Sequence, residues 1–284
     1  MTAEFKKISS EYITSIISDM VIKSNYIAPP ELIREMENSL KNEESPLGKR
    51  TINLLLDNYK TAQTDNFPIC QDTGLAVIMV DIGQQVIIEG DLEKAINAGV
   101  RQGYQDGFLR KSVLDHPLRR ENTGDNTPAI IHYHINPGNT LKITVMPKGG
   151  GSENASALKM LKPSDGEDGI IKFVTDQVIE QAANACPPLI IGVGIGSNFE
   201  GCAMLAKKAI ISRPIGTKSS DIDNARLEHK IIEIINASGI GPAGYGGTIT
   251  ALAVHVDSAP CHLACLPCAV NIQCNAHRIL QVTI

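Results

Sequence analysis

The sequence predicts a mixed α/β fold in which a helical N-terminal portion is followed by mixed sheets flanked by helices. Two observations carry this prediction. Apolar residues recur at helical spacing over residues 9–64, and beyond them short apolar runs alternate with helical stretches and glycine-containing loops. No internal repeat, low-complexity linker or clear boundary interrupts the chain. We therefore expect one domain over residues 1–284, with a helical segment over about 1–65 and a mixed α/β core over about 66–284.

The N-terminal helices are predicted from the spacing of apolar residues and from proline. Pro29 and Pro30 start a helix at about Glu31, because proline is tolerated in the first turn of a helix. A further helical stretch contains the three leucines at 54–56. The apolar face of the first helix is formed by Ile13, Ile16, Ile17, Met20 and Ile22.

The pattern then changes to short apolar runs typical of strands. The runs at 75–80 and 85–88 predict two strands separated by a turn at 81–83. Asp91 is a good N-cap residue and predicts a helix that extends to about Gln105.

The second half of the chain continues with strands and helices in alternation. Residues 129–135 and 141–146 alternate in polarity around Asn-Pro-Gly-Asn, which predicts a hairpin. The remaining elements are helices at about 153–161, 168–184, 199–210 and 221–238, and strands at 189–196, 248–256 and 263–272.

Composition and charge exclude several classes of protein. Of the 284 residues, 43% are hydrophobic and 20% are charged, and the net charge of -5 makes nucleic acid an unexpected partner. No run of 18 apolar residues predicts a membrane span. The N-terminus has no apolar segment of a secretory signal, so the cytoplasm is the expected compartment.

Seven cysteines are more than packing requires in a reducing compartment, and their odd number argues against disulfides. Cys202 lies in a helical, apolar stretch and is expected to be a buried small hydrophobe. Cys70, Cys186 and Cys274 are single cysteines in tight, polar or proline-stiffened sequence, which indicates a cluster assembled from distant parts of the chain. Three thiolates on four irons leave one iron open as a Lewis acid, which favours an enzyme.

A local cluster near the C-terminus is an alternative. Cys261, Cys265 and Cys268 have the C-x3-C-x2-C spacing of radical S-adenosylmethionine enzymes, and they could also form a small zinc site. Against both, the surrounding stretch is apolar and strand-like, and only sixteen residues follow Cys268. A non-catalytic, redox-sensing iron–sulfur protein that uses these thiols is a further alternative.

The glycine-rich segments differ in what they predict. Residues 192–196 lack the last spaced glycine of a dinucleotide fingerprint, so they predict a strand-to-helix turn. Residues 148–154 place three glycines before a helix, where backbone N–H groups can approach a carboxylate, although a plain capped turn explains them equally well. His132 and His134 share one face of a strand and are more simply solvent-facing than metal ligands.

Five motifs, taken together, resemble the iron–sulfur class I fumarate hydratases. The chain is most similar to the separate alpha subunit of the two-subunit forms, and it is also similar to the alpha subunit of tartrate dehydratase. The resemblance extends from about residue 10 to the end. The motifs are Cys70-Gln71-Asp72-Thr73-Gly74, Lys148-Gly149-Gly150-Gly151-Ser152-Glu153-Asn154, Cys186-Pro187-Pro188, Gly192-Val193-Gly194-Ile195-Gly196 and Leu266-Pro267-Cys268-Ala269-Val270-Asn271-Ile272-Gln273-Cys274.

The resemblance implies a set of site residues. A [4Fe-4S] cluster would have Cys70, Cys186 and Cys274 as its ligands. Asp72 matches an acid/base residue of the family, and His262 matches a histidine close to the reacting centre. Substrate carboxylates would be held by Gln71, Arg110 and the backbone at Gly150. Cys261, Cys265 and Cys268 depart from the family pattern, which has other residues there.

The resemblance also implies partners and a substrate class. The fused enzymes have a second domain that this sequence does not contain, so we expect a separate beta subunit to complete the site. We also expect the alpha chains to pair as dimers. The expected substrate is a small four-carbon dicarboxylate, with fumarate and malate ahead of tartrate.

Overall fold

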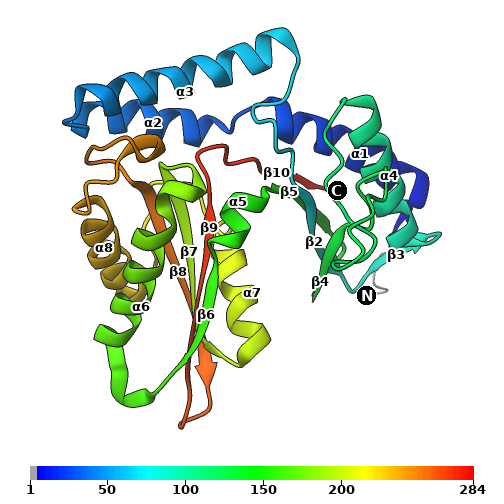
Figure 1. Cartoon of the computed structure of the whole chain (residues 1–284). Helices are drawn as coiled ribbons and strands as arrows, with labels where there is room; N and C mark the ends of the chain where they lie inside the picture. Colours follow the sequence, from blue (N-terminus) through cyan, green and yellow to red (C-terminus); the bar gives the residue numbers. More distant parts are fainter. Residues whose placement is uncertain (1–4) are drawn as a thin grey trace. The chain divides into compact units, whose positions relative to one another are not determined.

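A computed structural model describes residues 5–284 as a mixed α/β fold, which confirms the predicted fold class (Figure 1). Contacts within the chain divide it into two compact units. Unit 1 comprises residues 5–29, Tyr59–Gly150 and Arg278–Ile284, and unit 2 comprises Pro30–Asn58 and Gly151–His277. The sequence predicted one domain because no linker separates the units. The chain passes between them after Pro29, Asn58, Gly150 and His277.

Unit 1 is built on a four-stranded mixed sheet in the order β10-β5-β2-β4. Apolar side chains of two helices and of the central strands form its core. The elements of unit 1 are β1 (Lys6–Ser9), α1 (Ser10–Tyr26), β2 (Leu75–Gly83), β3 (Val86–Glu89), α4 (Leu92–Asp106), β4 (Ile130–Asn136), β5 (Leu141–Lys148) and β10 (Leu280–Thr283). Asp91 caps α4 by accepting a hydrogen bond from the Lys94 N–H, as its sequence position predicted.

Two predictions in this unit are wrong. Strands β4 and β5 do not form a hairpin, because β2 lies between them and pairs parallel with β4 and antiparallel with β5. The predicted turn at 81–83 lies inside β2. The hairpin is absent because the buried apolar side chains of β2 fill the centre of the sheet, and this burial outweighs the local turn preference of the Asn-Pro-Gly-Asn segment. Residues 81–83 form strand because they continue the pairing of β2 with β4, opposite residues 134–136.

Unit 2 is built on a second mixed sheet in the order β6-β9-β7-β8. Its helices include α2 (Pro30–Asn42), most of α3 (Pro46–Asp65), most of α5 (Gly150–Asn154), α6 (Gly166–Gln181), α7 (Phe199–Ala209) and α8 (Ile222–Asn236), with 3-10 turns η1 (Pro163–Asp165), η2 (Ala182–Ala185) and η3 (Pro242–Gly244). Its strands are β6 (Ala157–Leu161), β7 (Leu189–Ser197), β8 (Ala251–Cys261) and β9 (Leu266–Gln273). Residues 157–161, predicted as helix, form β6 instead because their backbone pairs with β9.

The two faces of this second sheet differ in polarity. Helices α6 and α8 cover one face (Figure 1), and the apolar core of the unit lies there. Helix α7 covers the other face, where the neighbouring strands carry the buried polar side chains of His255, Asn271 and Gln273. Gly192 and Gly194 allow α7 to approach β7, because a Cβ atom at Gly192 would stand 2.1 Å from the Ala206 carbonyl oxygen. Among residues 5–284 no helix is long and apolar enough to cross a membrane.

The close approach of α7 to β7 predicts a stability cost for a methyl group at Gly194. A Cβ atom there would stand 2.3 Å from the Cys202 carbonyl oxygen and 2.5 Å from the Ala206 nitrogen, and both are backbone atoms that cannot rotate away. We expect Gly194→Ala to lower the free energy of unfolding by about 3 kcal/mol or more, measured by urea denaturation. Gly138→Ala is the control, because its added Cβ meets no atom within 4 Å and only its positive φ is strained. Its cost should be about 1–2 kcal/mol, and equal costs for the two variants would contradict the prediction.

Candidate active site

The carboxylate of Asp72 is held by two backbone N–H groups of unit 1. Its Oδ1 accepts a hydrogen bond of 2.9 Å from Gly74 N, and its Oδ2 accepts one of 2.8 Å from Gly150 N. The first bond closes a tight turn around Thr73, and the second joins two motifs that are 78 residues apart in the sequence. A Cβ atom at Gly149 would stand 3.1 Å from Asp72 Oδ2, a tight contact that glycine avoids. In this structure the carboxylate at the glycine triple is the protein's own.

Buried polar side chains fix the rest of the loop that carries Cys70. The Tyr104 hydroxyl, 0% exposed, lies 2.8 Å from the Thr73 carbonyl oxygen and 2.9 Å from that of Gly74. Burial raises the pKa of Tyr104, so its hydroxyl stays protonated and donates. Asn126 donates to the Gly74 carbonyl and accepts from Ser112 N, which ties the loop to the segment after Arg110.

These contacts bring five predicted site residues into one connected part of unit 1. Thr73 Oγ1 donates to the Arg110 carbonyl at 2.8 Å, which links the Cys70 loop to the loop that carries Arg110. Gln71, Arg110 and Gly150 are exposed, while Cys70 and Asp72 are half-buried. The arrangement combines a fixed carboxylate, an accessible guanidinium, an accessible amide and a thiol. Such a set can bind a small dicarboxylic acid and exchange a proton with it.

Cys186 and Cys274 lie at the same end of the sheet in unit 2. Cys186 precedes β7, Cys274 follows β9, and the two strands pair antiparallel with Ile190 opposite Gln273. Asn275 joins the two cysteine loops directly, since its N–H and its Nδ2 both donate to the Cys186 carbonyl, at 3.1 and 2.8 Å. Cys186 has a left-handed backbone with φ of 56°, which turns the chain from η2 toward β7.

His262 lies at the other end of β9. It belongs to the turn between β8 and β9, where its Nδ1 accepts a hydrogen bond of 3.1 Å from Ala264 N. The neutral ring therefore carries its proton on Nε2. The eight residues of β9 separate His262 from Cys274, and at about 3.3 Å per residue the strand spans about 25 Å. The structure does not bring His262 and Cys274 of one chain together.

The thiols of the chain fall into two chemical groups. Cys202 and Cys268 are buried; burial raises the pKa of the Cys202 thiol to about 11 and raises that of Cys268 as well, which disfavours the thiolate that binds metal. The other five thiols are half-buried or exposed: Cys70, Cys186, Cys261, Cys265 and Cys274. Accessible thiols fit an iron–sulfur cluster, and among these five Cys186 and Cys274 lie on adjoining loops.

The alternative sites predicted from the sequence gain no support. Within residues 5–284 no group of three or more His, Cys, Asp and Glu side chains is placed to hold a metal ion, a finding that does not distinguish the C-terminal cysteines from the other predicted set. Cys268 is a core residue of β9, whereas Cys261 is exposed and its Sγ lies 3.3 Å from the Cys265 carbonyl oxygen. His134 is exposed, and its Nδ1 lies 3.2 Å from Asp81 Oδ1, so it is a surface residue.

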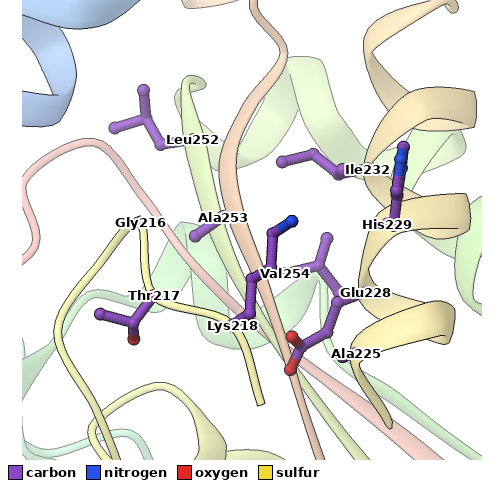
Figure 2. Close-up of a pocket in the computed structure, with 10 residues that line it drawn as sticks. All are labelled: Gly216, Thr217, Lys218, Ala225, Glu228, His229, Ile232, Leu252, Ala253 and Val254. Atoms are coloured by element: carbon purple, nitrogen blue, oxygen red, sulfur yellow. The ribbon is translucent and has the colours of Figure 1, made fainter. Parts of the chain in front are cut away.

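A cavity of about 280 Å³ in unit 2 lies apart from these residues (Figure 2). Its wall includes Lys218, Glu228 and His229, together with apolar side chains of α8 and β8. The Glu228 carboxylate accepts hydrogen bonds from the Arg213 guanidinium and from the N–H groups of Ser219 and Val256, so it stabilises the fold. None of the predicted site residues lines this cavity.

Comparison with known proteins agrees with the motifs. A model of the fumarate hydratase (Fumerase) family matches residues 14–283. This chain belongs to the Fumerase family. The putative L(+)-tartrate dehydratase subunit alpha of Methanocaldococcus jannaschii is 38% identical over 273 residues, covering 94% of this chain and 95% of that protein. The L(+)-tartrate dehydratase subunit alpha of Escherichia coli (strain K12) is 31% identical over 281 residues, covering 98% and 92%.

All predicted site residues of this Fumerase-family chain lie inside the matched segment. Sequence reasoning missed four buried polar residues that hold the Cys70 loop in place. No sequence pattern indicates the left-handed backbone of Asn126, with φ of 61°. Tyr104 is one of several tyrosines, and nothing in the sequence distinguishes it from the others. The four residues are Asn25, Tyr104, Asn126 and Arg278.

Proposed function

We propose that this chain is the alpha subunit of an iron–sulfur hydro-lyase that reversibly hydrates a four-carbon dicarboxylate, with fumarate to malate as the leading reaction. One observation carries the proposal beyond family membership. The Asp72 carboxylate lies fixed between Gly74 N and Gly150 N, in the loop that also carries Cys70 and next to the loop that carries Arg110.

The ligands of the proposed [4Fe-4S] cluster are Cys70, Cys186 and Cys274. When bound, the cluster supplies an open iron that acts as a Lewis acid toward the hydroxyl and a carboxylate oxygen of the substrate. The adjoining loops of Cys186 and Cys274 and the accessibility of all three thiols support this assignment.

The remaining roles fall to side chains and amides of unit 1. The exposed guanidinium of Arg110 can hold a carboxylate through two parallel hydrogen bonds, and Gln71 adds a neutral donor. Gly150 N already donates to Asp72 Oδ2, so a substrate carboxylate can take that amide only by sharing it or by releasing Asp72. Release would free the Asp72 carboxylate for proton transfer as the substrate binds. Hydration adds a hydroxyl to one alkene carbon and a proton to the other. We propose that the Asp72 carboxylate accepts the carbon-bound proton in dehydration, and that the resulting carboxylic acid returns a proton to that carbon in hydration.

A separate beta subunit is part of the proposal. Both relatives carry the words "subunit alpha" in their names, and this chain covers 95% and 92% of their lengths. The beta subunit would supply the remaining contacts to the substrate.

Tartrate is the second candidate substrate, and the names of the relatives favour it. Tartrate and malate differ by one hydroxyl group. Gln71, Arg110 and Gly150 are placed to bind carboxylates, which both substrates have, so these residues do not discriminate between them. The ratio of kcat/KM for malate and tartrate dehydration, measured on the complex with its beta subunit, decides between the two.

Removal of the Asp72 carboxylate tests the proposal. Asp72→Asn keeps the size of the side chain but loses the charge, and we expect kcat to fall by about 10²- to 10⁴-fold in the complex of alpha and beta chains. The alpha chain alone should have no activity. Asp125→Asn is the matched control, because Asp125 forms the same kind of turn in unit 1 by accepting from Thr127 N at 2.9 Å. Full activity of Asp72→Asn, or an enzyme-like rate of the alpha chain alone, would refute this assignment.

We also propose that the alpha chains pair, and the position of His262 supports it. That histidine lies about one strand length, roughly 25 Å, from Cys274 of its own chain, in an exposed turn where Leu263 is 88% exposed. If His262 acts near the reacting centre, a second copy is the simplest way to bring it there.

Complementation between two inactive variants tests whether His262 acts at the cluster of its own chain or at that of a second copy. Cys274→Ser removes a proposed cluster ligand, and His262→Asn removes the histidine. When the two variants are co-expressed with the beta subunit, a mixed pair contains one intact site only if His262 acts on the partner's cluster. We expect activity to reappear in the mixture but not in either variant alone. A mixture as inactive as its components would show that His262 does not act in the other copy.

A further inference from the structure

Arg278 is a buried cation to which neither the motifs nor the proposed mechanism gives a role. It is 1% exposed and is the largest fully buried side chain of the described residues. A buried guanidinium is costly unless its donors are satisfied. Its Nη1 donates to the Asp72 carbonyl at 2.6 Å and to Asn25 Oδ1 at 3.0 Å, while its Nε has no partner among residues 5–284.

Asn25 completes a clamp on the segment that contains Cys70. Asn25 is 0% exposed; its carbonyl accepts from Ile69 N at 2.9 Å, and its Oδ1 accepts from Arg278. Its Nδ2 donates to the Val21 carbonyl inside α1, so its amide cannot rotate without losing that bond. Asn25 and Arg278 thus hold both ends of residues 69–72. Cys70 and Gln71 lie between the two held points.

The guanidinium also lies close to the Asp72 carboxylate. The Cβ position at Gly149 stands 3.1 Å from Asp72 Oδ2 and 3.6 Å from Arg278 Nη2, which together place these two atoms no more than 6.7 Å apart. A positive charge at this distance attracts the carboxylate. Arg278 therefore acts on the Asp72 backbone by a hydrogen bond and on its side chain by charge.

The position of Arg278 in the sequence links two proposed cluster ligands. Only three residues separate it from Cys274, and it holds the carbonyl of Asp72, two residues after Cys70. The segment that carries one ligand thus also supplies the anchor for the loop of another.

We propose that Arg278 is a positioning residue that holds residues 69–72, so that the Cys70 thiol and the Asp72 carboxylate are presented in one fixed geometry. The roles of Cys70 and Asp72 rest on the proposed function, but the anchoring of the loop does not. The anchor uses both branches of the guanidinium. Nη1 donates to the Asp72 carbonyl and to Asn25 Oδ1, while Nη2 lies on the side of the Asp72 carboxylate.

The test compares Arg278→Ala with Arg213→Ala in the full chain after anaerobic reconstitution with iron and sulfide. Arg213 is the matched control because it is also a largely buried arginine, paired with Glu228 in unit 2. Amide hydrogen exchange of residues 69–74 and the rate of iron release to a chelator are measured for both variants. In Arg278→Ala we expect these amides to exchange, and iron to be released, at least tenfold faster than in wild type. In Arg213→Ala both rates should match those of wild type.

Chemical rescue separates positioning from a general loss of stability. Free guanidinium at millimolar concentration should restore slow exchange and slow iron release in Arg278→Ala, whereas equal urea should not. If Arg278→Ala does not fold, Arg278→Lys replaces it, and its single ammonium should leave the loop amides exchanging faster than in wild type. Wild-type exchange in the Arg278 variants, equal loosening in Arg213→Ala, or rescue by urea would overturn the proposal. The two proposals can fail separately. If the wild-type chain shows no hydro-lyase activity with its beta subunit, the proposed function is refuted. The anchoring role of Arg278 still stands in that case if Arg278→Ala loosens the loop.

Discussion

The candidate site depends on how the segment from Ile69 to Gly74 is fixed. Its side chains include the proposed functional groups, and hydrogen bonds to its backbone hold it in place. The two carboxylate oxygens of Asp72 accept hydrogen bonds from the N–H groups of Gly74 and Gly150. Buried donors occupy the carbonyl groups of residues 72–74 from the other side. A loop fixed in this way presents its thiol and carboxylate without the entropy loss that a mobile loop would suffer on binding a ligand. Gly149 fits the same arrangement, since a Cβ atom there would stand 3.1 Å from Asp72 Oδ2.

The second sheet explains how cysteines 88 residues apart in the sequence reach one place. Strands β7 and β9 pair antiparallel, so Cys186, before β7, and Cys274, after β9, lie at the same end of the sheet. The glycines of β7 let α7 pack directly on the sheet, and the apolar core on the opposite face stabilises the strands. The same topology places His262 at the opposite end of the sheet. A purely structural property, strand direction, therefore determines which of the predicted residues can share a site within one chain.

The sequence named exposed and half-buried residues of the candidate site but none of the buried residues beneath them. The cysteine, glycine and Asp72 motifs are local and read directly, and the N-caps and the glycine-rich strand followed from short-range chemistry. The hairpin at β4 and β5 was wrong because strand order is decided by distant burial, which a local turn cannot report. Arg278 and Asn25 were missed for the same reason: their contacts join residues 206 and 253 positions apart. The two units left no trace in the sequence, because the chain passes between them without a linker.

We propose that Cys70, distant in sequence from Cys186 and Cys274, holds an open-iron cluster with them. Electron paramagnetic resonance on wild type and Cys70→Ser, after anaerobic reconstitution and mild oxidation, tests this assignment. We expect a three-iron signal in wild type, formed by loss of the open iron, and no such signal in Cys70→Ser. An unchanged signal in Cys70→Ser would assign the cluster to the C-terminal cysteines and refute the proposal.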